Sequence, residues 1–151
     1  MTRSEDKNDP YNLARFVREQ DRVYSLALSE ITAGRKHSPW MWYVFPQFLG
    51  LGRSETSMAF AIKSSAEAEA YLAHPLLGPR LIECCEALLS LDGLSARDIF
   101  GSPDDLKLRS SLSLFAAESP SGSVFHKTLE KYFMGRPDAR TLDLLKAARE
   151  R

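Results

Sequence analysis

The chain has 151 residues, of which 44% are hydrophobic and 26% charged, and its formal net charge is zero. This length is typical of one domain, and a balanced charge offers no field that would hold nucleic acid or an anionic membrane. No apolar run reaches the roughly 20 residues of a membrane-spanning helix, so we expect no membrane partner. We predict a single helical domain over residues 10–151 after a flexible N-terminus, residues 1–9.

Cysteine and histidine usage argues against a disulfide or a metal centre. The two cysteines are Cys84 and Cys85; adjacent cysteines rarely pair, and two alone do not form a zinc site. The histidines lie far apart without ligand partners at helical spacing. We therefore expect reduced core thiols, no metal and no cofactor, in a cytoplasmic protein that is a monomer or a weak dimer. The charged residues 1–9 are unlike a signal peptide.

The first helix is predicted to run from Asp9-Pro10 to Gly34. Asp9 is a suitable N-cap and Pro10 a suitable first helical residue, while Gly34 is typical of a helix end. Gln20 falls on the apolar face of this helix, where a buried amide needs partners. The face itself is formed at helical spacing by Leu13, Phe16, Val17, Tyr24, Ala27, Leu28 and Ile31.

Residues 37–52 concentrate the aromatic side chains. They include both tryptophans, three further aromatic rings and two prolines, but no acid. The prolines exclude a long helix, and residues 42–45 have strand propensity. We expect one short strand or hairpin near 42–45 and 58–62. Because buried indole and phenol groups need hydrogen-bond partners, polar groups from elsewhere are expected to converge on this segment.

The second half of the chain carries repeated helix-start signals. Capping residues precede helical patterns at Ser64, Ser95, Ser102, Ser123 and Asp138. The helix predicted over 103–117 is apolar on more than one side, which is typical of a central helix. About seven helices result, with no convincing sheet. We therefore predict an all-α globule built around residues 103–117.

Several segments together resemble a known family. They are Phe16-Val17 with Gln20, Gly34-Arg35-Lys36, Trp40-Met41-Trp42 with Phe45-Pro46-Gln47, Gly50-Leu51-Gly52, Tyr71-Leu72 with His74-Pro75, Leu77-Gly78, Arg80-Leu81, Phe100-Gly101, and Asp104-Leu106-Lys107 through Ser110, Ser111 and Phe115. On these residues the chain resembles, over almost its whole length, the bacterial DUF1810 family, often automatically named calpastatin. The resemblance implies a small, mostly helical, stand-alone domain without an established activity. Nothing resembles a calpastatin inhibitory repeat, and calpastatins are disordered.

Asp104, Lys107 and Ser111 share one face of the predicted central helix. In one interpretation, the first two form an ordinary salt bridge worth roughly 0.3 kcal/mol. In the other, the charges point into a pocket lined by the aromatic segment, because buried charges require a partner or a ligand. The sequence leaves both interpretations open.

An uncharged hydrogen-bonding set accompanies Trp40 and Trp42, and consists of Gln20, His37, Tyr43 and Gln47. Aromatic faces with amides and one basic residue commonly bind planar bases or nucleosides. The contact to a phosphate would then come from one of three cations, Arg35, Lys36 or Arg80.

Two functions follow from these patterns. The first is a site that binds or processes a nucleotide or an ADP-ribose-like molecule; the second is a non-catalytic interaction or structural module whose aromatic segment is core. The first predicts one partly open cavity around His37, Trp40, Trp42, Gln47, Asp104 and Lys107. If a reaction occurs there, His37 or Asp104 would carry the proton and Lys107 would hold the anion. The sequence decides neither the ligand nor whether there is a reaction.

Overall fold

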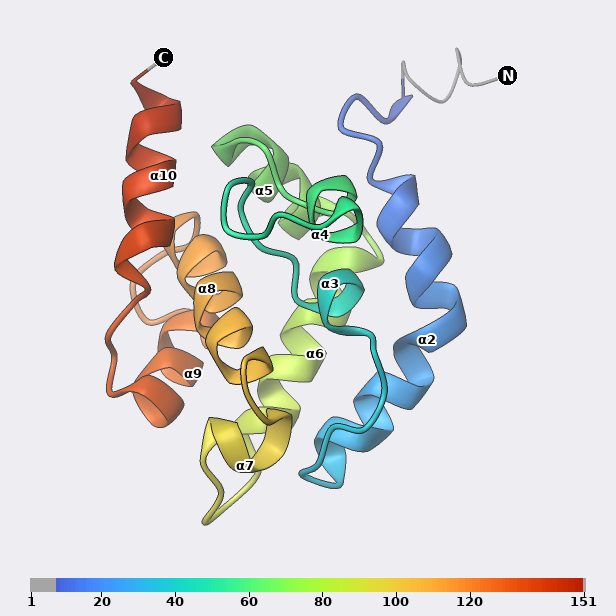
Figure 1. Cartoon of the computed structure of the whole chain (residues 1–151), viewed down its shortest axis with the longest axis vertical. Helices are drawn as coiled ribbons and strands as arrows, with labels where there is room; N and C mark the ends of the chain where they lie inside the picture. Colours follow the sequence, from blue (N-terminus) through green and yellow to red (C-terminus); the bar gives the residue numbers. More distant parts are fainter. Residues whose placement is uncertain (1–7, 151) are drawn as a thin grey trace.

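The computed structural model describes residues 8–150, and nine α-helices form the regular structure within them (Figure 1). In chain order these are α2 (Ala14–Thr32), α3 (Met41–Val44), α4 (Glu55–Ala59), α5 (Ser65–Ala73), α6 (Leu77–Leu89), α7 (Ala96–Phe100), α8 (Asp104–Ala117), α9 (Val124–Phe133) and α10 (Ala139–Arg149). The predicted all-α fold is confirmed. The prediction of a flexible N-terminus falls largely on residues 1–7, which lie outside the described residues.

Helix α8 lies at the centre of the fold, as its apolar sequence predicts. It packs against α5, α7, α9 and α10, and it buries Leu108, Leu112 and Phe115. Leu106 is an exception, because it is 55% exposed near the start of the helix. Figure 1 shows α2 and α10 on opposite flanks of the molecule, with α6 and α8 between them.

A chain of aromatic rings connects α2 to α9 through the core. The ring of Phe16 on α2 lies 5.2 Å from that of Tyr71 on α5, edge to face. Tyr71 lies 5.3 Å from Phe115 on α8, and Phe115 lies 5.9 Å from Phe125 on α9. Such pairs each contribute about 0.5–1.5 kcal/mol beyond the burial of their area. This row of rings therefore helps to hold α2, α5 and α9 against α8.

Most of the predicted caps are present. The side chains of Ser64, Ser95, Ser123 and Asp138 each accept a backbone N–H at the start of a helix. Ser102 is not a cap, because Pro103 takes the N-cap position of α8 and no side chain caps that end.

The first helix begins later than predicted. It starts at Ala14, after a turn in which Asn12 has a positive φ of 51°. Asp9 still acts on this helix from a distance, because its carboxylate accepts the backbone N–H groups of Leu13 at 2.7 Å and Ala14 at 2.9 Å. The predicted N-cap and first residue are therefore both wrong, since the N-cap of α2 is Leu13, although Asp9 does accept N–H groups at the start of the helix.

The predicted strand or hairpin is also wrong. Residues 42–45 fall mainly in α3, and residues 55–59 form α4. Among the described residues, a single parallel bridge between Phe48 and Ile62 is the only extended pairing. Strand propensity expresses a fit to a half-buried pleated surface rather than an intrinsic backbone preference. In this fold the segment closes one helical turn, in which the carbonyl of Trp40 accepts N–H groups from Tyr43 and Val44.

Both cysteines lie in the core on α6. Cys84 and Cys85 are free and buried, as predicted. Burial raises the pKa of the Cys84 thiol to about 12 and also raises the pKa of Cys85. Reactive thiols have lowered pKa values and are accessible, so these two residues act as core side chains. No helix among residues 8–150 is long and apolar enough to cross a membrane.

Candidate functional site

A small cavity lies between the segment leading into α3 and the first turn of α8. Its volume is about 150 Å³. The residues that line it come from two distant parts of the sequence, and are Lys36, Pro39, Met41, Trp42, Asp104 and Lys107. It therefore combines one end of the aromatic segment with the charged start of the central helix.

Two lysines share one carboxylate in this cavity. The Nζ atom of Lys36 lies 2.8 Å from Oδ2 of Asp104, and the Nζ atom of Lys107 lies 3.1 Å from Oδ1 of the same residue. The side chains of Lys36, Asp104 and Lys107 are 8%, 20% and 26% exposed. Two ammonium groups against one carboxylate leave the cluster with one positive charge, largely shielded from water.

The carboxylate of Asp104 is held in its ionised form. Partial burial would raise its pKa, but hydrogen bonds from Lys36 and Lys107 and their positive charges outweigh burial, and the pKa is lowered. Its place in the first turn of α8 also favours the negative charge, because the helix dipole is positive there. Asp104 is therefore a permanent anion near neutral pH, and its chemical task is to hold the two lysines.

Both lysines also lie over indole rings. The Nζ atom of Lys107 is 4.4 Å from the centre of the Trp42 ring, and that of Lys36 is 5.0 Å from the centre of the Trp40 ring. Cation–π contacts strengthen when the cation is removed from water. The indoles thus hold the ammonium groups in place while the cluster keeps its excess positive charge.

Glu30, at the end of α2, fixes the segment that carries Lys36. Its Oε1 atom accepts the backbone N–H of His37 at 2.9 Å and of Ser38 at 3.1 Å, and the indole N–H of Trp40 at 2.8 Å. Its Oε2 atom accepts the hydroxyl of Ser38 at 2.6 Å. Burial alone would raise the pKa of Glu30, but these donors lower it to about 2. Glu30 was not among the residues predicted from the sequence, although an acid beside Ile31 on the buried face of α2 is a usable signal.

The structure brings three of the predicted site residues to the cavity: Trp42, Asp104 and Lys107. Lys36, one of three cations considered for a phosphate contact, also lines it. His37 does not line it; its side chain is exposed, and its backbone is held by Glu30. Trp40 is fully buried beneath the segment and belongs to the core.

Three other predicted residues, Gln20, Tyr43 and Arg80, belong to a separate network between α2 and α6. The amide Nε2 of Gln20 donates to the backbone oxygen of Tyr43 at 2.7 Å and to the hydroxyl of Tyr71 at 3.0 Å. The guanidinium of Arg80 lies 4.8 Å from the centre of the Tyr24 ring. None of these side chains lines the cavity of Trp42, so this network ties helices together and takes no part in the candidate site.

The last two predicted residues, Gln47 and Ser111, are buried, and each has one side-chain polar atom without a partner. Among the described residues, Gln47 Nε2 and Ser111 Oγ are the two buried side-chain polar atoms that find no hydrogen-bond partner. A buried donor without a partner costs about 1–3 kcal/mol. These atoms therefore require an explanation beyond the packing of the chain.

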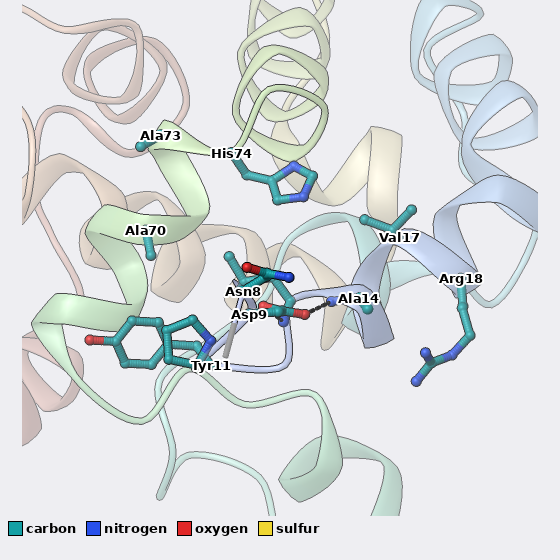
Figure 2. A pocket seen from close by; sticks show the side chains of 11 residues that line it. Asn8, Asp9, Tyr11, Ala14, Val17, Arg18, Ala70, Ala73 and His74 are labelled. Carbon is teal, nitrogen blue, oxygen red and sulfur yellow. Dashed lines mark hydrogen bonds between the residues drawn. The ribbon is translucent and has the colours of Figure 1, made fainter. Parts of the chain in front are cut away.

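A larger cavity of about 540 Å³ lies where the chain enters α2 and passes the end of α5 (Figure 2). Small apolar side chains form much of its wall, among them Ala14, Ala70 and Ala73. In Figure 2, the guanidinium of Arg18 points away from its centre. The Nδ1 atom of His74 already accepts the N–H groups at the start of α6. This cavity lacks the convergent charges of the smaller one.

No three His, Cys, Asp or Glu side chains within residues 8–150 come together in a way that could hold a metal ion.

Comparisons with known proteins agree with the fold and leave the activity open. No curated protein matches the chain. A crystal structure of the conserved hypothetical protein Rv1873 from Mycobacterium tuberculosis is similar to it, with 48% sequence identity and a TM-score of 0.89. That match covers 91% of this chain and 99% of the other. Residues 10–145 match the family described as "Protein of unknown function (DUF1810)", and the chain therefore belongs to the DUF1810 family.

Proposed function

We propose that the cavity between α3 and α8 binds the anionic group of a small molecule, a phosphate or a carboxylate. One observation carries this proposal: Lys36 and Lys107 share the single carboxylate of Asp104 and retain one positive charge in a shielded cavity. An unbalanced and partly desolvated charge is costly unless a counter-charge compensates it. An anion that enters the cavity provides this counter-charge.

The size of the cavity limits what enters it. About 150 Å³ is below the roughly 300–1,000 Å³ of sites that enclose a whole drug-sized ligand. It accommodates a phosphate-sized group, and the remainder of the ligand lies outside. Half-buried Trp42 is the aromatic side chain at this edge. A nucleotide or an ADP-ribose-like molecule fits this arrangement, because it combines phosphates with planar groups.

The proposal assigns binding roles and no reaction. Lys36 and Lys107 hold the anion, Asp104 orients both ammonium groups, and Trp42 forms the wall beside Lys107. Asp104 is a poor proton donor because its pKa is lowered. His37, the other proton carrier considered, does not line the cavity.

A structural role is the competing function, and the burial of the aromatic segment favours it. Trp40 and Phe45 are fully buried, and the pair of Lys36 with Asp104 ties the segment before α3 to α8. If the cluster is only such a tie, it stabilises the fold and binds no anion.

Calorimetric titration with inorganic phosphate and with ADP-ribose tests the proposal. The wild-type chain should bind both, and Lys107→Met should weaken both by roughly tenfold or more, because a charge-assisted hydrogen bond is lost. Lys131→Met is the matched control, since Lys131 also lies over an aromatic ring, that of Tyr132, at 5.5 Å, and does not line the cavity. It should leave both affinities unchanged.

Two results would overturn the proposal. One is the absence of phosphate and ADP-ribose binding to the wild-type chain. The other is equal binding by wild type and Lys107→Met. A fall in thermal stability of Lys107→Met, without anion binding to either chain, would establish the structural role instead.

A further inference from the structure

Three serines on α8 are buried, and one of them behaves differently from the others. The hydroxyl of Ser110 donates to the backbone oxygen of Leu106 at 3.1 Å, and that of Ser113 donates to the backbone oxygen of Arg109 at 2.7 Å. A serine inside a helix usually donates its hydroxyl to a backbone carbonyl of the preceding turn in this way. Ser111 makes no such bond, although it is fully buried.

The position of Ser111 relates it to the anion cavity. It lies four residues after Lys107 and seven after Asp104, so all three share one face of α8. Helical side chains lean toward the N-terminus of their helix, so the Ser111 side chain leans toward the turn of Lys107. Ser111 therefore lies on the side of α8 that carries the lysine cluster.

Gln47 comes to the same part of α8 from the segment that leaves α3. Trp42 of α3 lies under Lys107, and the segment that follows α3 reaches Gly50, which lies against Leu144 of α10. Helix α10 runs along the second half of α8. Its N-cap residue Asp138 donates a backbone N–H to Ser113, and Arg149 near its end pairs with Glu118.

Gln47 lies between Trp42 and Gly50 in sequence, so it belongs to the stretch that leads from the Lys107 side of α8 to α10. One unpartnered atom thus belongs to α8, which supplies Asp104 and Lys107 to the anion cavity, and the other to the stretch that follows Trp42; neither Ser111 nor Gln47 itself lines the cavity.

We propose that Gln47 and Ser111 form a neutral inner part of this site, which recognises a hydroxyl or carbonyl oxygen next to the anionic group of the ligand. The inference rests on the proposed function, because the lysines position the anion. It narrows the ligand to a phosphorylated hydroxy compound such as a ribose phosphate. The amide Nε2 of Gln47 donates to a sugar oxygen, and the hydroxyl of Ser111 donates to or accepts from it.

Access to these atoms requires a movement. Neither atom is exposed, and the Lys107 side chain, which is 26% exposed, belongs to the preceding turn of α8 and is held by Trp42 and Asp104. An anion that draws the Lys107 ammonium toward itself moves the side chain that precedes Ser111 by one turn on this face of α8.

The test compares ribose 5-phosphate with inorganic phosphate by calorimetric titration. The wild-type chain should bind ribose 5-phosphate roughly tenfold or more tightly than phosphate, since the sugar oxygen supplies partners that the buried donors lack. Ser111→Ala and Gln47→Leu should each reduce this ratio to below about threefold, while the affinity for phosphate stays unchanged. Ser110→Ala is the matched control and should keep the full ratio, because that hydroxyl already has a partner.

The outcomes separate this inference from the proposed function. If the wild-type chain binds no phosphate, the anion site itself is refuted. If it binds phosphate and ribose 5-phosphate equally, or if both variants keep the full ratio, the anion site stands and the inner site is refuted. Circular dichroism and thermal unfolding of each variant show whether it is folded, and a misfolded Ser111→Ala leaves Gln47→Leu to decide.

Discussion

Lys36 lies 2.8 Å from Asp104 with only 8% of its side chain exposed. The lysine lies in the segment before α3 and the aspartate in the first turn of α8, so this pair joins the two segments that form the cavity. The attraction between buried charges offsets their desolvation only when the geometry is good, and removal of one partner leaves a charge without compensation. Asp104 is thus the residue on which the geometry of the cluster depends.

Asp104→Asn should lower the free energy of unfolding by about 2 kcal/mol, because it leaves the Lys36 ammonium partly buried without its anion. Asp105→Asn is the matched control, since Asp105 lies in the same first turn of α8 and caps only the N–H of Leu106. Its effect should be below about 0.5 kcal/mol. Urea denaturation measures both changes, and equal values for the two variants would contradict the role of Asp104.

Glu30 should make the stability of the fold depend on acid pH. Its pKa is about 2 in the folded chain and near 4.3 in an unfolded one. A carboxyl with a lowered pKa stabilises the fold above the unfolded value, and this contribution disappears as the pH falls through the folded value. Between about pH 4.5 and pH 2, stability should therefore decline by about 2 kcal/mol or more through this group.

Glu30→Gln should remove that part of the pH dependence and should already be destabilised at pH 7. Glu19→Gln is the control, because Glu19 forms only a surface pair with Arg22 at 3.0 Å. Urea denaturation at several pH values reports both variants. An unchanged slope of stability against pH in Glu30→Gln would show that other carboxyls control the acid transition.

Ser111 and Ser113 should respond differently to the same substitution. Ser113→Ala removes a hydroxyl that donates to Arg109 and accepts the N–H of Asp138 at 2.8 Å, and it should cost about 1–2 kcal/mol of unfolding free energy. Ser111→Ala removes a hydroxyl without a partner, and should be neutral or stabilising without ligand. Thermal and urea unfolding decide the matter. A loss at Ser111 as large as that at Ser113 would show that its hydroxyl is engaged in the unliganded fold.

Cys84 and Cys85 should not react in the native chain. Both are buried, and burial raises both pKa values, so the nucleophilic thiolate is scarce at neutral pH. Iodoacetamide at pH 7.5 should leave both unmodified by mass spectrometry, and should modify both in concentrated urea. Rapid modification of either thiol in the native chain would contradict their assignment to the core.

The fold was predictable where the signals are local. The apolar faces of α2, α6 and α8, and the caps at Ser64, Ser95 and Asp138, depend on residues within a few positions of one another. The prediction failed at residues 42–45, where the surrounding core forms a helical turn from residues with strand propensity. It also failed at Ser102, because the neighbouring Pro103 takes the cap position.

The candidate site was predictable to a similar extent. Asp104 and Lys107 share a helix face at local spacing, and Trp42 stood out by composition. The contribution of Lys36 to the same carboxylate depends on how α2 ends relative to α8, which no local pattern records. Glu30 had a local signal, because it is an acid beside Ile31 on the buried face of α2, but its partners belong to a loop whose path only the folded chain defines.

The distance in sequence between Lys36 and Asp104 has a kinetic consequence. Their contact closes a loop that contains α3, α4, α5, α6 and α7, and contacts of such range require loop closure before they contribute energy. A contact made late in folding is absent from the transition state, so its loss accelerates unfolding and leaves the folding rate nearly unchanged. We therefore expect Asp104→Asn to accelerate unfolding more than it slows folding.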